Sequence, residues 1–359
     1  MRRDQNQYFF ASNARRHERT HRFRNTVLIF LPLILIAVVI MNYTVSNRVR
    51  LEEMRLTVLN LPADLEEYSI LHISDLHGAR FGENQKAIAA ALSGSRYSCV
   101  VMTGDMLGKD RDPEPLLELI AALPADVPKY LIPGDTDGGF TETTAHGSLS
   151  VYADWAVQLQ AAGVHLVDRP MKETRGKGTI WFVPEELYML DLDVTESVYK
   201  KQQASMREQA ASLTADDAAR LREIDYELSR LEEIRALKKE FQPEDIQIVL
   251  THTPLTEEYV ANMISWTGKE DYFSMRYAGL ILAGHYNGGQ WRIPFQGAIY
   301  VPELGWFPKD EQIMGLSYLQ GIPQHISPGM GSDPHYEKQP GRIFNPPVIT
   351  KIVLTRKAT

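Results

Sequence analysis

Cysteine is nearly absent from this chain of 359 residues. The only one is Cys99, so no disulfide can form within the chain. Cys99 lies in the apolar run SCVVMTG, where a free cysteine is most simply a small core residue. The scarcity of cysteine does not identify a compartment, because an exported domain can fold without disulfides.

An excess of positive charge is also missing. The chain has 38 Lys and Arg residues against 46 Asp and Glu residues, a formal net charge of −8. This balance gives no general reason to expect nucleic-acid binding. The sequence shows no internal repeats and no low-complexity linker. Its hydrophobic fraction of 44% and charged fraction of 23% are typical of a globular protein, and its length suits one large domain or two ordinary ones.

The average charge hides an asymmetric N-terminus. Residues 1–25 carry seven arginines against two acidic residues, and residues 26–45 carry no charge at all. Twenty helical residues at about 1.5 Å each span the roughly 30 Å core of a bilayer. We therefore expect a transmembrane helix over residues 26–45. The basic tail, residues 1–25, should remain cytoplasmic, and everything after residue 46 should lie outside.

Two other interpretations of the apolar segment stay open. A cleaved signal peptide also combines a basic lead with an apolar run, but this lead is long and no clear small-x-small cleavage site follows. A buried helix of a soluble domain is the second alternative. Pro32 does not decide among them, because proline is tolerated in membrane helices.

After the apolar segment, strand-like runs alternate with helical patterns. The helical patterns cover residues 84–94, 113–123 and 152–164. The strand-like runs cover residues 55–61, 68–75, 98–105, 130–137, 246–254, 279–289 and 344–355. This alternation predicts an α/β fold in which helices cover a sheet.

Residues 190–242 have a different composition, dense in Glu, Lys, Arg, Ala and Gln. Apolar residues recur from Leu221 to Leu237 at spacings of three and four, which indicates an amphipathic helix. Thr214 and Asp217 resemble a capping box at its start, and a first helix is expected over residues 196–211. We interpret the segment as a helical insertion. It is either an antiparallel hairpin that packs its own apolar stripe, or a lid or partner-binding arm.

Polar residues follow five of the apolar runs. The motifs are ISDLHG, MTGDML, PGDTDGG, LTHTP and AGHYNGG, and their polar residues are Asp75, His77, Asp105, Asp135, Asp137, His252, His285 and Asn287. Carboxylates and imidazoles that converge at one sheet edge repel each other or stay unpaired unless a cation joins them. Five such motifs in order predict a metal site. A purely structural polar cluster is the alternative.

These motifs resemble those of the calcineurin-like metallophosphoesterases, particularly their membrane-anchored bacterial branch. The family pattern is D-x-H, G-D, G-N-H-[DE], a later H and G-H-x-H, and this chain has D-L-H, G-D, G-D-T-D, T-H-T-P and G-H-Y-N. SPGMGS and GRIFNPP also resemble the family's closing segments. The resemblance implies a phosphoesterase domain over residues 55–356, interrupted by the 190–242 insertion. The implied fold is a four-layer β-sandwich flanked by helices.

The same resemblance implies two divalent metal ions. Carried over by position, the ligands of the first are Asp75, His77, Asp105 and Asn287. The ligands of the second are Asp105, Asp135, His252 and His285, with Asp105 bridging. Two cations about 3.5–4 Å apart generate hydroxide at neutral pH and clamp the oxygens of an in-line phosphoryl displacement.

The chain departs from the family pattern at three positions. Asp135 replaces an asparagine, so the second metal should be held at least as well. Asn287 replaces a histidine, which gives the first site three oxygens and one nitrogen. Among Mn, Mg, Fe, Ca and Zn, that donor set leans toward manganese, magnesium or calcium. Thr136 replaces the histidine that in the family stabilises charge and helps the leaving group depart.

Thr136 and Asp137 are therefore the catalytic candidates beside the metal ligands, with Asp137 supporting a ligand from behind. A threonine hydroxyl cannot supply a proton near neutral pH as imidazole does. If the protein is active, we expect it to prefer phosphoanhydrides or aryl-type esters over simple alkyl phosphodiesters. His146 is a candidate replacement for the missing imidazole, although a surface-loop histidine is the simpler interpretation.

The expected function is a metal-dependent phosphohydrolase tethered to the membrane with its catalytic domain outside. Its substrate would be a phosphorylated small molecule or a lipid-linked phosphoester. The alternative is a catalytically impaired pseudoenzyme that binds a phosphorylated ligand, or a protein partner through the helical insertion. A metal-free envelope scaffold is a third hypothesis. The retained aspartates and histidines favour the first function, whereas Thr136 and Asn287 favour the second.

Overall fold

The computed structural model describes residues 28–142, 151–208, 214–266, 272–333 and 341–356. The chain divides into two compact units, Met1–Asn47 and Arg48–Thr359. In the first unit, Leu28–Ser46 forms one helix that is long and apolar enough to cross a membrane. An N-terminal signal sequence has the same two properties.

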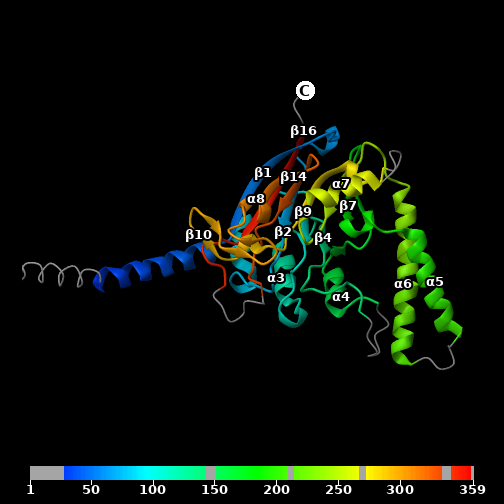
Figure 1. Cartoon of the computed structure of the whole chain (residues 1–359), viewed down its shortest axis with the longest axis horizontal. Helices are drawn as coiled ribbons and strands as arrows, with labels where there is room; N and C mark the ends of the chain where they lie inside the picture. The colour runs from blue at the N-terminus through cyan, green and yellow to red at the C-terminus, as the bar shows by residue number, and fades with distance from the viewer. Residues whose placement is uncertain (1–27, 143–150, 209–213, 267–271, 334–340, 357–359) are drawn as a thin grey trace, which may run out of the picture. The chain divides into compact units, whose positions relative to one another are not determined.

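The second unit is built on two six-stranded sheets (Figure 1). The first sheet has the order β1-β16-β2-β3-β4-β5, with strands Arg50–Val58, Val348–Arg356, Ser69–Ile73, Cys99–Thr103, Lys129–Ile132 and Val164–Leu166. β2 to β5 run parallel, as strands joined by helices do. β16 is parallel to β1 and antiparallel to β2. The C-terminal strand therefore lies between the first two strands of the unit.

The second sheet has the order β14-β15-β9-β8-β7-β6. Its strands, in that order, are Gly315–Leu319, Ile322–Ile326, Ala278–Ala283, Ile246–Leu250, Gly178–Pro184 and Met171–Arg175. β15, β9, β8 and β7 are parallel, and the outer strands β14 and β6 are antiparallel to their neighbours. Each sheet thus has parallel strands at its centre, whose carboxyl ends point the same way within that sheet.

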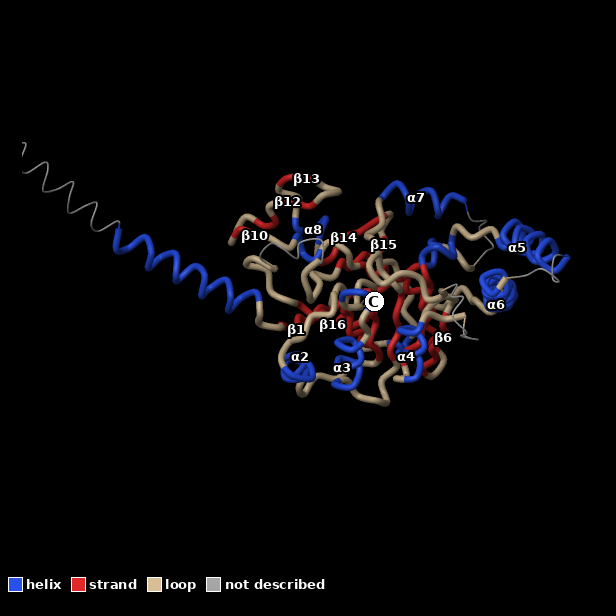
Figure 2. The backbone as a smooth tube through the Cα atoms, turned by 90° about the horizontal axis from the view of Figure 1, so that it is seen from below, coloured by secondary structure: helices blue, strands red, loops and turns tan. Residues whose placement is uncertain are grey.

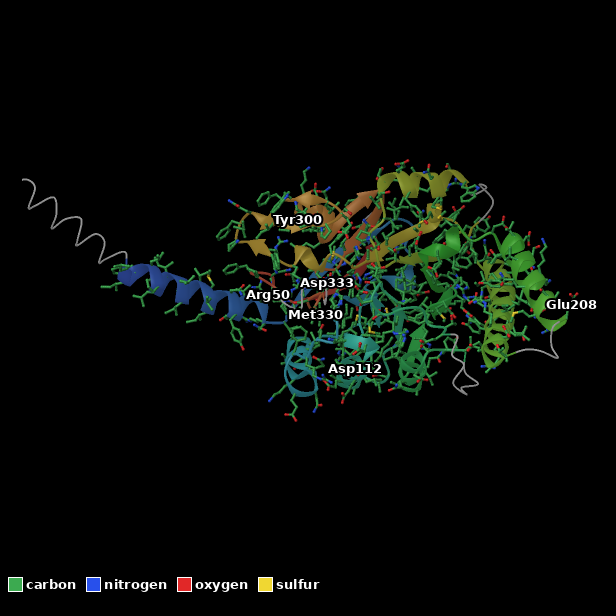
Figure 3. The ribbon with its side chains drawn as sticks, turned by 60° about the horizontal axis from the view of Figure 1, so that its bottom comes forward. Arg50, Asp112, Glu208, Tyr300, Met330 and Asp333 are labelled. Atoms are coloured by element: carbon green, nitrogen blue, oxygen red, sulfur yellow. The ribbon has the colours of Figure 1, made fainter. Side chains whose placement is uncertain are left out.

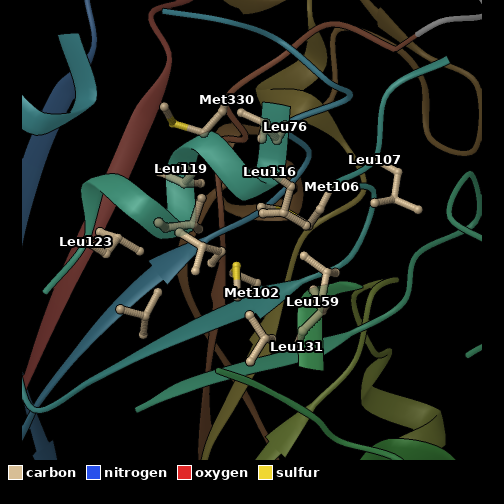
Figure 4. Close-up of a cluster of buried hydrophobic side chains, with 14 of the residues drawn as sticks. Leu76, Met102, Met106, Leu107, Leu116, Leu119, Leu123, Leu131, Leu159 and Met330 are labelled. Atoms are coloured by element: carbon tan, nitrogen blue, oxygen red, sulfur yellow. The ribbon is translucent and has the colours of Figure 1, made fainter. Parts of the chain in front are cut away.

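Apolar side chains fill the space between the two sheets. Other apolar side chains cover the outer face of each sheet. Val101 of β3 and Ile248 of β8 belong to the core between the sheets, and Cys99 is buried there as predicted. Val100 and Met102 face the other way, into a second core under helices (Figure 4). β3 is buried on both faces, which explains why its sequence CVVMT is apolar almost throughout.

Helices cover the outer faces of both sheets. α2, α3 and α4 (Lys86–Leu92, Glu114–Ala122 and Asp154–Ala161) pack on the first sheet. α6 and α7 (Ala215–Lys238 and Glu257–Trp266) contribute to the cores on the second sheet. The layers are therefore helix, sheet, sheet and helix, which confirms the predicted four-layer α/β sandwich. The three helices predicted at residues 84–94, 113–123 and 152–164 are confirmed as α2, α3 and α4.

Shorter elements complete the second unit. The strands β10 to β13 are Arg292–Ile293, Gly297–Ala298, Tyr300–Val301 and Gly305–Trp306, and α8 is Asp310–Ile313. They form a small lobe beside the sandwich (Figure 2). The 3₁₀ turns are Ala63–Leu65, Glu83–Gln85, Lys109–Arg111, Glu185–Tyr188, Met275–Tyr277 and Asn287–Gly289.

The segment predicted as a helical insertion contains α5 (Leu192–Glu208) and α6. The helices are antiparallel: Arg235 near the end of α6 pairs with Asp193 at the start of α5, at 2.7 Å. The predicted capping box is confirmed, because Thr214 and Asp217 bond to each other's backbone N–H. α6 buries Ile234 against the second sheet, whereas α5 has no buried residue among those described. α6 is thus docked on the domain, whereas α5 reaches that core with Leu192 at its start.

Candidate metal centre

The structure brings all seven predicted ligands to the carboxyl ends of parallel strands. In the first sheet, Asp75 and His77 follow β2, Asp105 follows β3 and Asp135 follows β4. In the second sheet, His252 follows β8, and His285 and Asn287 follow β9. Strand ends of this kind are where α/β proteins gather ligand-binding groups. We call these seven residues the polar cluster.

Five residues of the polar cluster have a left-handed backbone. The φ angles are +53° at Asp75, +46° at His77, +53° at Asp105, +80° at His285 and +49° at Asn287. Such conformations cost about 1–3 kcal/mol each, less for Asp and Asn, and persist only where the surrounding structure enforces them. Their concentration in one cluster is typical of a functional site rather than of an ordinary set of turns.

Two glycines allow the loops of the cluster to approach one another. A Cβ atom on Gly134 would lie 2.3 Å from Oδ1 of Asp105. A Cβ atom on Gly104, where φ is +88°, would lie 2.7 Å from Nδ1 of His252. No side chain fits at either position without displacing a candidate ligand. The glycine in each G-D motif is therefore required by the closeness of the ligands.

One half of the polar cluster is centred on Asp135 and His252. Nε2 of His252 lies 3.3 Å from Oδ2 of Asp105 and 3.9 Å from Oδ2 of Asp135. Nδ1 of His285 lies 3.2 Å from Oδ2 of Asp135 and 3.4 Å from Nε2 of His252. Ligand atoms of Asp135, His252 and His285 all lie within 4.8 Å of one another, close enough to share one metal ion.

The hydrogen bonding of His252 fixes which nitrogen faces the carboxylates. Nδ1 lies 2.8 Å from the carbonyl oxygen of Thr103, to which only an N–H can donate. In the neutral ring, Nε2 then carries the lone pair, and it points toward Asp105 and Asp135. A backbone carbonyl behind the imidazole is the arrangement that orients metal-binding histidines.

The other half of the polar cluster holds His77 and Asn287. Nε2 of His77 lies 3.8 Å from Oδ2 of Asp105 and 3.3 Å from Nδ2 of Asn287. Among the described residues, Nδ1 of His77 and Oδ1 of Asn287 are buried without a hydrogen-bond partner. Buried polar atoms without partners are rare. Because a half-turn of the amide exchanges its oxygen and nitrogen, Oδ1 can take the place beside His77, where a cation would satisfy it.

Electrostatics within the cluster favour positive charge. Burial raises the pKa of Asp75. Burial also disfavours the charged form of Asp105, but the hydrogen bond and charge of His252 outweigh it and hold the pKa of Asp105 below its usual range. Burial opposes protonation of His252, yet its hydrogen bond to Asp105 and the nearby carboxylates raise its pKa to about 10. The donor set therefore fits divalent cations, which neutralise the same carboxylates.

The two catalytic candidates both act on neighbouring groups. The backbone N–H and the hydroxyl of Thr136 donate to Oδ1 of Asp105, at 2.8 and 2.9 Å. The buried carboxylate of Asp137 accepts from the backbone N–H groups of Met106, Leu107 and Gly134. Thr136 thus orients a candidate ligand, and Asp137 joins the loops that follow β3 and β4. His146 lies outside the described residues.

Three groups at the site were not predicted from the sequence. The hydroxyl of Ser74 donates to Oδ2 of Asp75, and the carbonyl of Thr103 holds His252. Both residues stand next to predicted motifs, so their position was the available signal. Glu303 places Oε1 3.6 Å from Nε2 of His285. It comes from the β12–β13 hairpin, and nothing in the sequence connects that hairpin with the motifs.

A cavity of about 330 Å³ adjoins the polar cluster at His252. Tyr226, Glu227 and Arg230 of α6 also line this cavity. α6 is tied there by Arg230, whose Nε donates to the carbonyl of Asp168 at 2.7 Å, and by a hydrogen bond from Tyr226 to the Asp168 carboxylate. The predicted helical segment therefore forms a wall of the cavity next to the candidate metal ligands.

A four-layer sandwich with carboxylates and imidazoles at its strand ends defines a candidate metalloprotein. The sequence model of the calcineurin-like phosphoesterase family matches residues 68–286, more than half of the chain. The chain therefore belongs to the calcineurin-like phosphoesterase family, which is binuclear and metal-dependent. Six residues of the polar cluster lie inside the matched range, and Asn287 follows directly after it.

The solved structures that are similar to this chain include a phosphopantetheinyl hydrolase from Mycobacterium tuberculosis. The sequences are 16% identical, the match covers 73% of this chain and 89% of the other, and the TM-score is 0.34. At this level of similarity, the neighbour's activity is a property of that protein alone. None of the curated proteins compared with the chain matches it significantly.

Proposed function

We propose that this protein is a metal-dependent phosphohydrolase, tethered to a membrane by residues 28–46 with its phosphoesterase domain on the outside. The observation that carries the hydrolase activity is the polar cluster, where three aspartates, three histidines and an asparagine converge. The observation that supports the tether is the apolar helix that precedes the domain. The proposed substrates are phosphoesters or phosphoanhydrides, including lipid-linked ones.

Each residue of the polar cluster has a proposed role. Asp105 stands between the halves, within 4 Å of both His77 and His252, and would bridge two cations. Asp75, His77 and Asn287 would complete the first site. Asp135, His252 and His285 would complete the second. The cations, when bound, supply an activated water and neutralise charge on the phosphoryl group.

The chain's own groups prepare the site for that chemistry. Thr103 holds the His252 ring with Nε2 facing the carboxylates, and Ser74 holds the Asp75 carboxylate. Asp137 keeps the loops after β3 and β4 together through backbone bonds. Ligands held rigidly need no rearrangement when a substrate arrives, and preorganisation of this kind favours catalysis.

We propose that Thr136 does not act as a general acid, so the leaving group receives no proton from this position. Its hydroxyl is already donated to Asp105, at 2.9 Å, so it is not directed toward a leaving group. A positioned general acid typically contributes about 10²–10⁴-fold to the rate. Substrates whose leaving groups depart without a proton should therefore be preferred.

The test compares two phosphate monoesters on residues 48–359 supplied with manganese. Release of inorganic phosphate is measured from p-nitrophenyl phosphate and from ethyl phosphate, whose leaving group needs a proton. We expect turnover of the nitrophenyl ester to exceed that of the ethyl ester by at least about 10²-fold. Thr136→His should narrow this ratio, whereas Thr136→Ser, the matched control, should leave it unchanged.

Equal turnover of the two esters would contradict the role given to Thr136. Phosphate release from neither ester, or release that survives in Asp105→Ala, would contradict the hydrolase itself. Either of those two results would favour the second candidate, a pseudoenzyme that binds a phosphorylated ligand or a protein partner. The engaged hydroxyl of Thr136 is the observation that favours this candidate. Its partner surface would be α5, which exposes Val194 and Val198.

A further inference from the structure

Large apolar side chains are exposed in an unusual concentration between residues 293 and 307. The side chains are Ile293, Phe295, Tyr300, Leu304, Trp306 and Phe307. Phe295 is fully exposed, and Trp306 and Phe307 are 71% and 58% exposed. We call these six residues the aromatic patch. Soluble proteins rarely present so many apolar groups together without a binding role.

The aromatic patch stands on a lobe that is itself ordered. Ala298, Val301 and Ile313 are buried in a small core beneath it. Within the lobe, Arg292 of β10 forms an ion pair with Asp310 of α8 at 2.7 Å. The exposure of the patch is therefore a fixed property of the lobe and not the result of a loose loop.

Backbone strain holds two of the aromatic side chains outward. Phe295 has φ of +68° and Phe307 has φ of +53°. A bulky residue in the left-handed region is a conformational outlier that costs free energy. Neither ring is buried in the domain, so burial of apolar surface does not offset the backbone strain. Two strained and exposed phenylalanines indicate that the contact compensating this cost lies outside the chain.

The lobe lies at the end of the domain where the chain enters it. The backbone N–H of Arg292 donates to the carbonyl of Ile343, and Val348, five residues later, pairs with Arg50 at the start of β1. In Figure 3 the labelled Tyr300 of the lobe lies on the same side of the domain as Arg50, and in Figure 2 β10 and β12 lie on the same side as β1. Residues 47–49 alone separate β1 from the apolar helix, and three residues span at most about 11 Å.

We propose that the aromatic patch docks on the surface of a lipid bilayer, with its side chains at the boundary between headgroups and acyl chains. The proposal rests on the proposed membrane tether, whose short linker keeps this end of the domain near the bilayer. Trp and Tyr suit that boundary because each combines a large apolar ring with a polar N–H or O–H group, and Phe adds apolar surface that enters the acyl region. A tether also raises the effective concentration of the patch at the surface.

Docking would bring the polar cluster to the membrane surface. Glu303, on the hairpin between Tyr300 and Trp306, lies 3.6 Å from Nε2 of the candidate ligand His285. The substrate class that fits this placement is a phosphoester carried in the headgroup of a membrane lipid. A soluble phosphoester would reach the cluster without help from the patch.

The test uses residues 48–359, because the five apolar cores draw on residues 49–354 and so do not require the N-terminal helix. Its binding is measured by co-sedimentation with vesicles of phosphatidylcholine, alone or mixed with phosphatidylglycerol. We expect binding to both, with little dependence on salt, because the patch is apolar. The double variant Trp306→Ser/Phe307→Ser should lower the partition coefficient about tenfold or more.

Tyr318→Ser is the matched control, since Tyr318 is 60% exposed on β14 and lies outside the patch. It should bind vesicles as the unsubstituted domain does. Absence of vesicle binding, or equal binding by the double variant, would overturn the proposal. A concentration-dependent dimer that the double variant abolishes would overturn it as well, by assigning the patch to a second copy of the chain.

Hydrolysis of p-nitrophenyl phosphate separates this proposal from the proposed function. The double variant should hydrolyse that soluble ester at the rate of the unsubstituted domain. It should hydrolyse a phospholipid in vesicles more slowly than the unsubstituted domain does. If neither protein releases phosphate, the hydrolase proposal fails, but the vesicle-binding result still decides whether the patch docks on a bilayer.

Discussion

The two sheets contribute different chemistry to the polar cluster. Loops of the first sheet supply all three carboxylates, Asp75, Asp105 and Asp135, whereas the cluster residues in loops of the second are two imidazoles and an amide: His252, His285 and Asn287. Negative charge therefore comes from one sheet and most of the nitrogen donors from the other. The candidate centre exists only where the two sheets meet, so its geometry depends on how the sandwich is packed.

A second pair of histidines joins the same two sheets below the polar cluster. Nδ1 of His72 on β2 lies 2.8 Å from Nδ1 of His325 on β15, and Nε2 of His72 lies 2.9 Å from the Thr103 hydroxyl. Both rings are fully buried, and burial lowers the pKa of both. The imidazoles at the edge of the sandwich are placed to bind cations, whereas those inside it are held neutral.

The largest expected effect follows from removing the shared carboxylate of the first sheet. Asp105→Asn keeps the shape of the side chain but removes the charge that would serve both cations. Since bound metal supplies several kcal/mol of transition-state stabilisation, we expect kcat/KM for p-nitrophenyl phosphate to fall about 10³-fold or more. Asp154→Asn, an exposed change on α4, is the control and should leave kcat/KM unchanged. An active Asp105→Asn protein would contradict the bridging role.

Removing an imidazole of the second sheet should cost less. His252→Asn keeps a polar group near the position of Nδ1 and deletes Nε2, the proposed ligand atom of the second cation, which lies 3.3 Å from Oδ2 of Asp105 and 3.9 Å from Oδ2 of Asp135. We expect a loss of about 10²-fold in kcat/KM, within the range for removing one electrostatic stabiliser. Elemental analysis should find one cation lost and one kept. Loss of both cations would show that the two sheets do not divide the ligands as described.

The buried histidine pair should make stability depend on pH. Burial lowers the pKa of His325 to about 4, so between pH 6.5 and pH 4 the unfolded chain binds a proton that the folded chain does not. The free energy of unfolding should therefore fall as pH falls, by roughly 2 kcal/mol between pH 7 and pH 5 for this residue. His325→Asn should remove that part of the slope in denaturant titrations with a chelator present. An unchanged slope would show that His325 is not held neutral.

The smallest effect concerns the one oxygen ligand that the second sheet supplies. Asn287→His replaces an amide oxygen with a nitrogen, which softer metals prefer. We expect the affinity for zinc relative to manganese to rise about tenfold, measured by competition between the two metals. The matched substitution Asn345→His is unsuitable as a control because Asn345 is buried against the same loop. Asn262→His, on α7, serves instead and should leave the ratio unchanged.

Much of this architecture was predictable because local patterns specify it. The helices on the first sheet carry clear apolar stripes, and the ligand motifs stand directly after apolar strands such as β3 and β8. Each polar motif directly follows a strand, and neighbouring parallel strands end at the same edge of their sheet. The order of strands and motifs in the sequence therefore places these groups at one edge. The four-layer sandwich itself was expected from the family resemblance.

Other features depend on contacts that sequence does not encode locally. β16 lies between β1 and β2, a pairing that no local pattern shows. β14 and β15 contain polar residues and a proline, so they do not resemble buried strands, and β7 was not predicted although its sequence is apolar. His72 and His325 look like ordinary strand residues until the sheets are packed. Glu303 approaches His285 only through the fold of a separate hairpin.

The central claim is that the two sheets together build a centre for two metal ions. The most direct test is the metal content of purified residues 48–359, measured by elemental analysis beside Asp105→Ala. The account predicts close to two divalent ions per chain, both lost when Asp105 is replaced. No metal, or a single ion that the Asp105→Ala protein also retains, would contradict it.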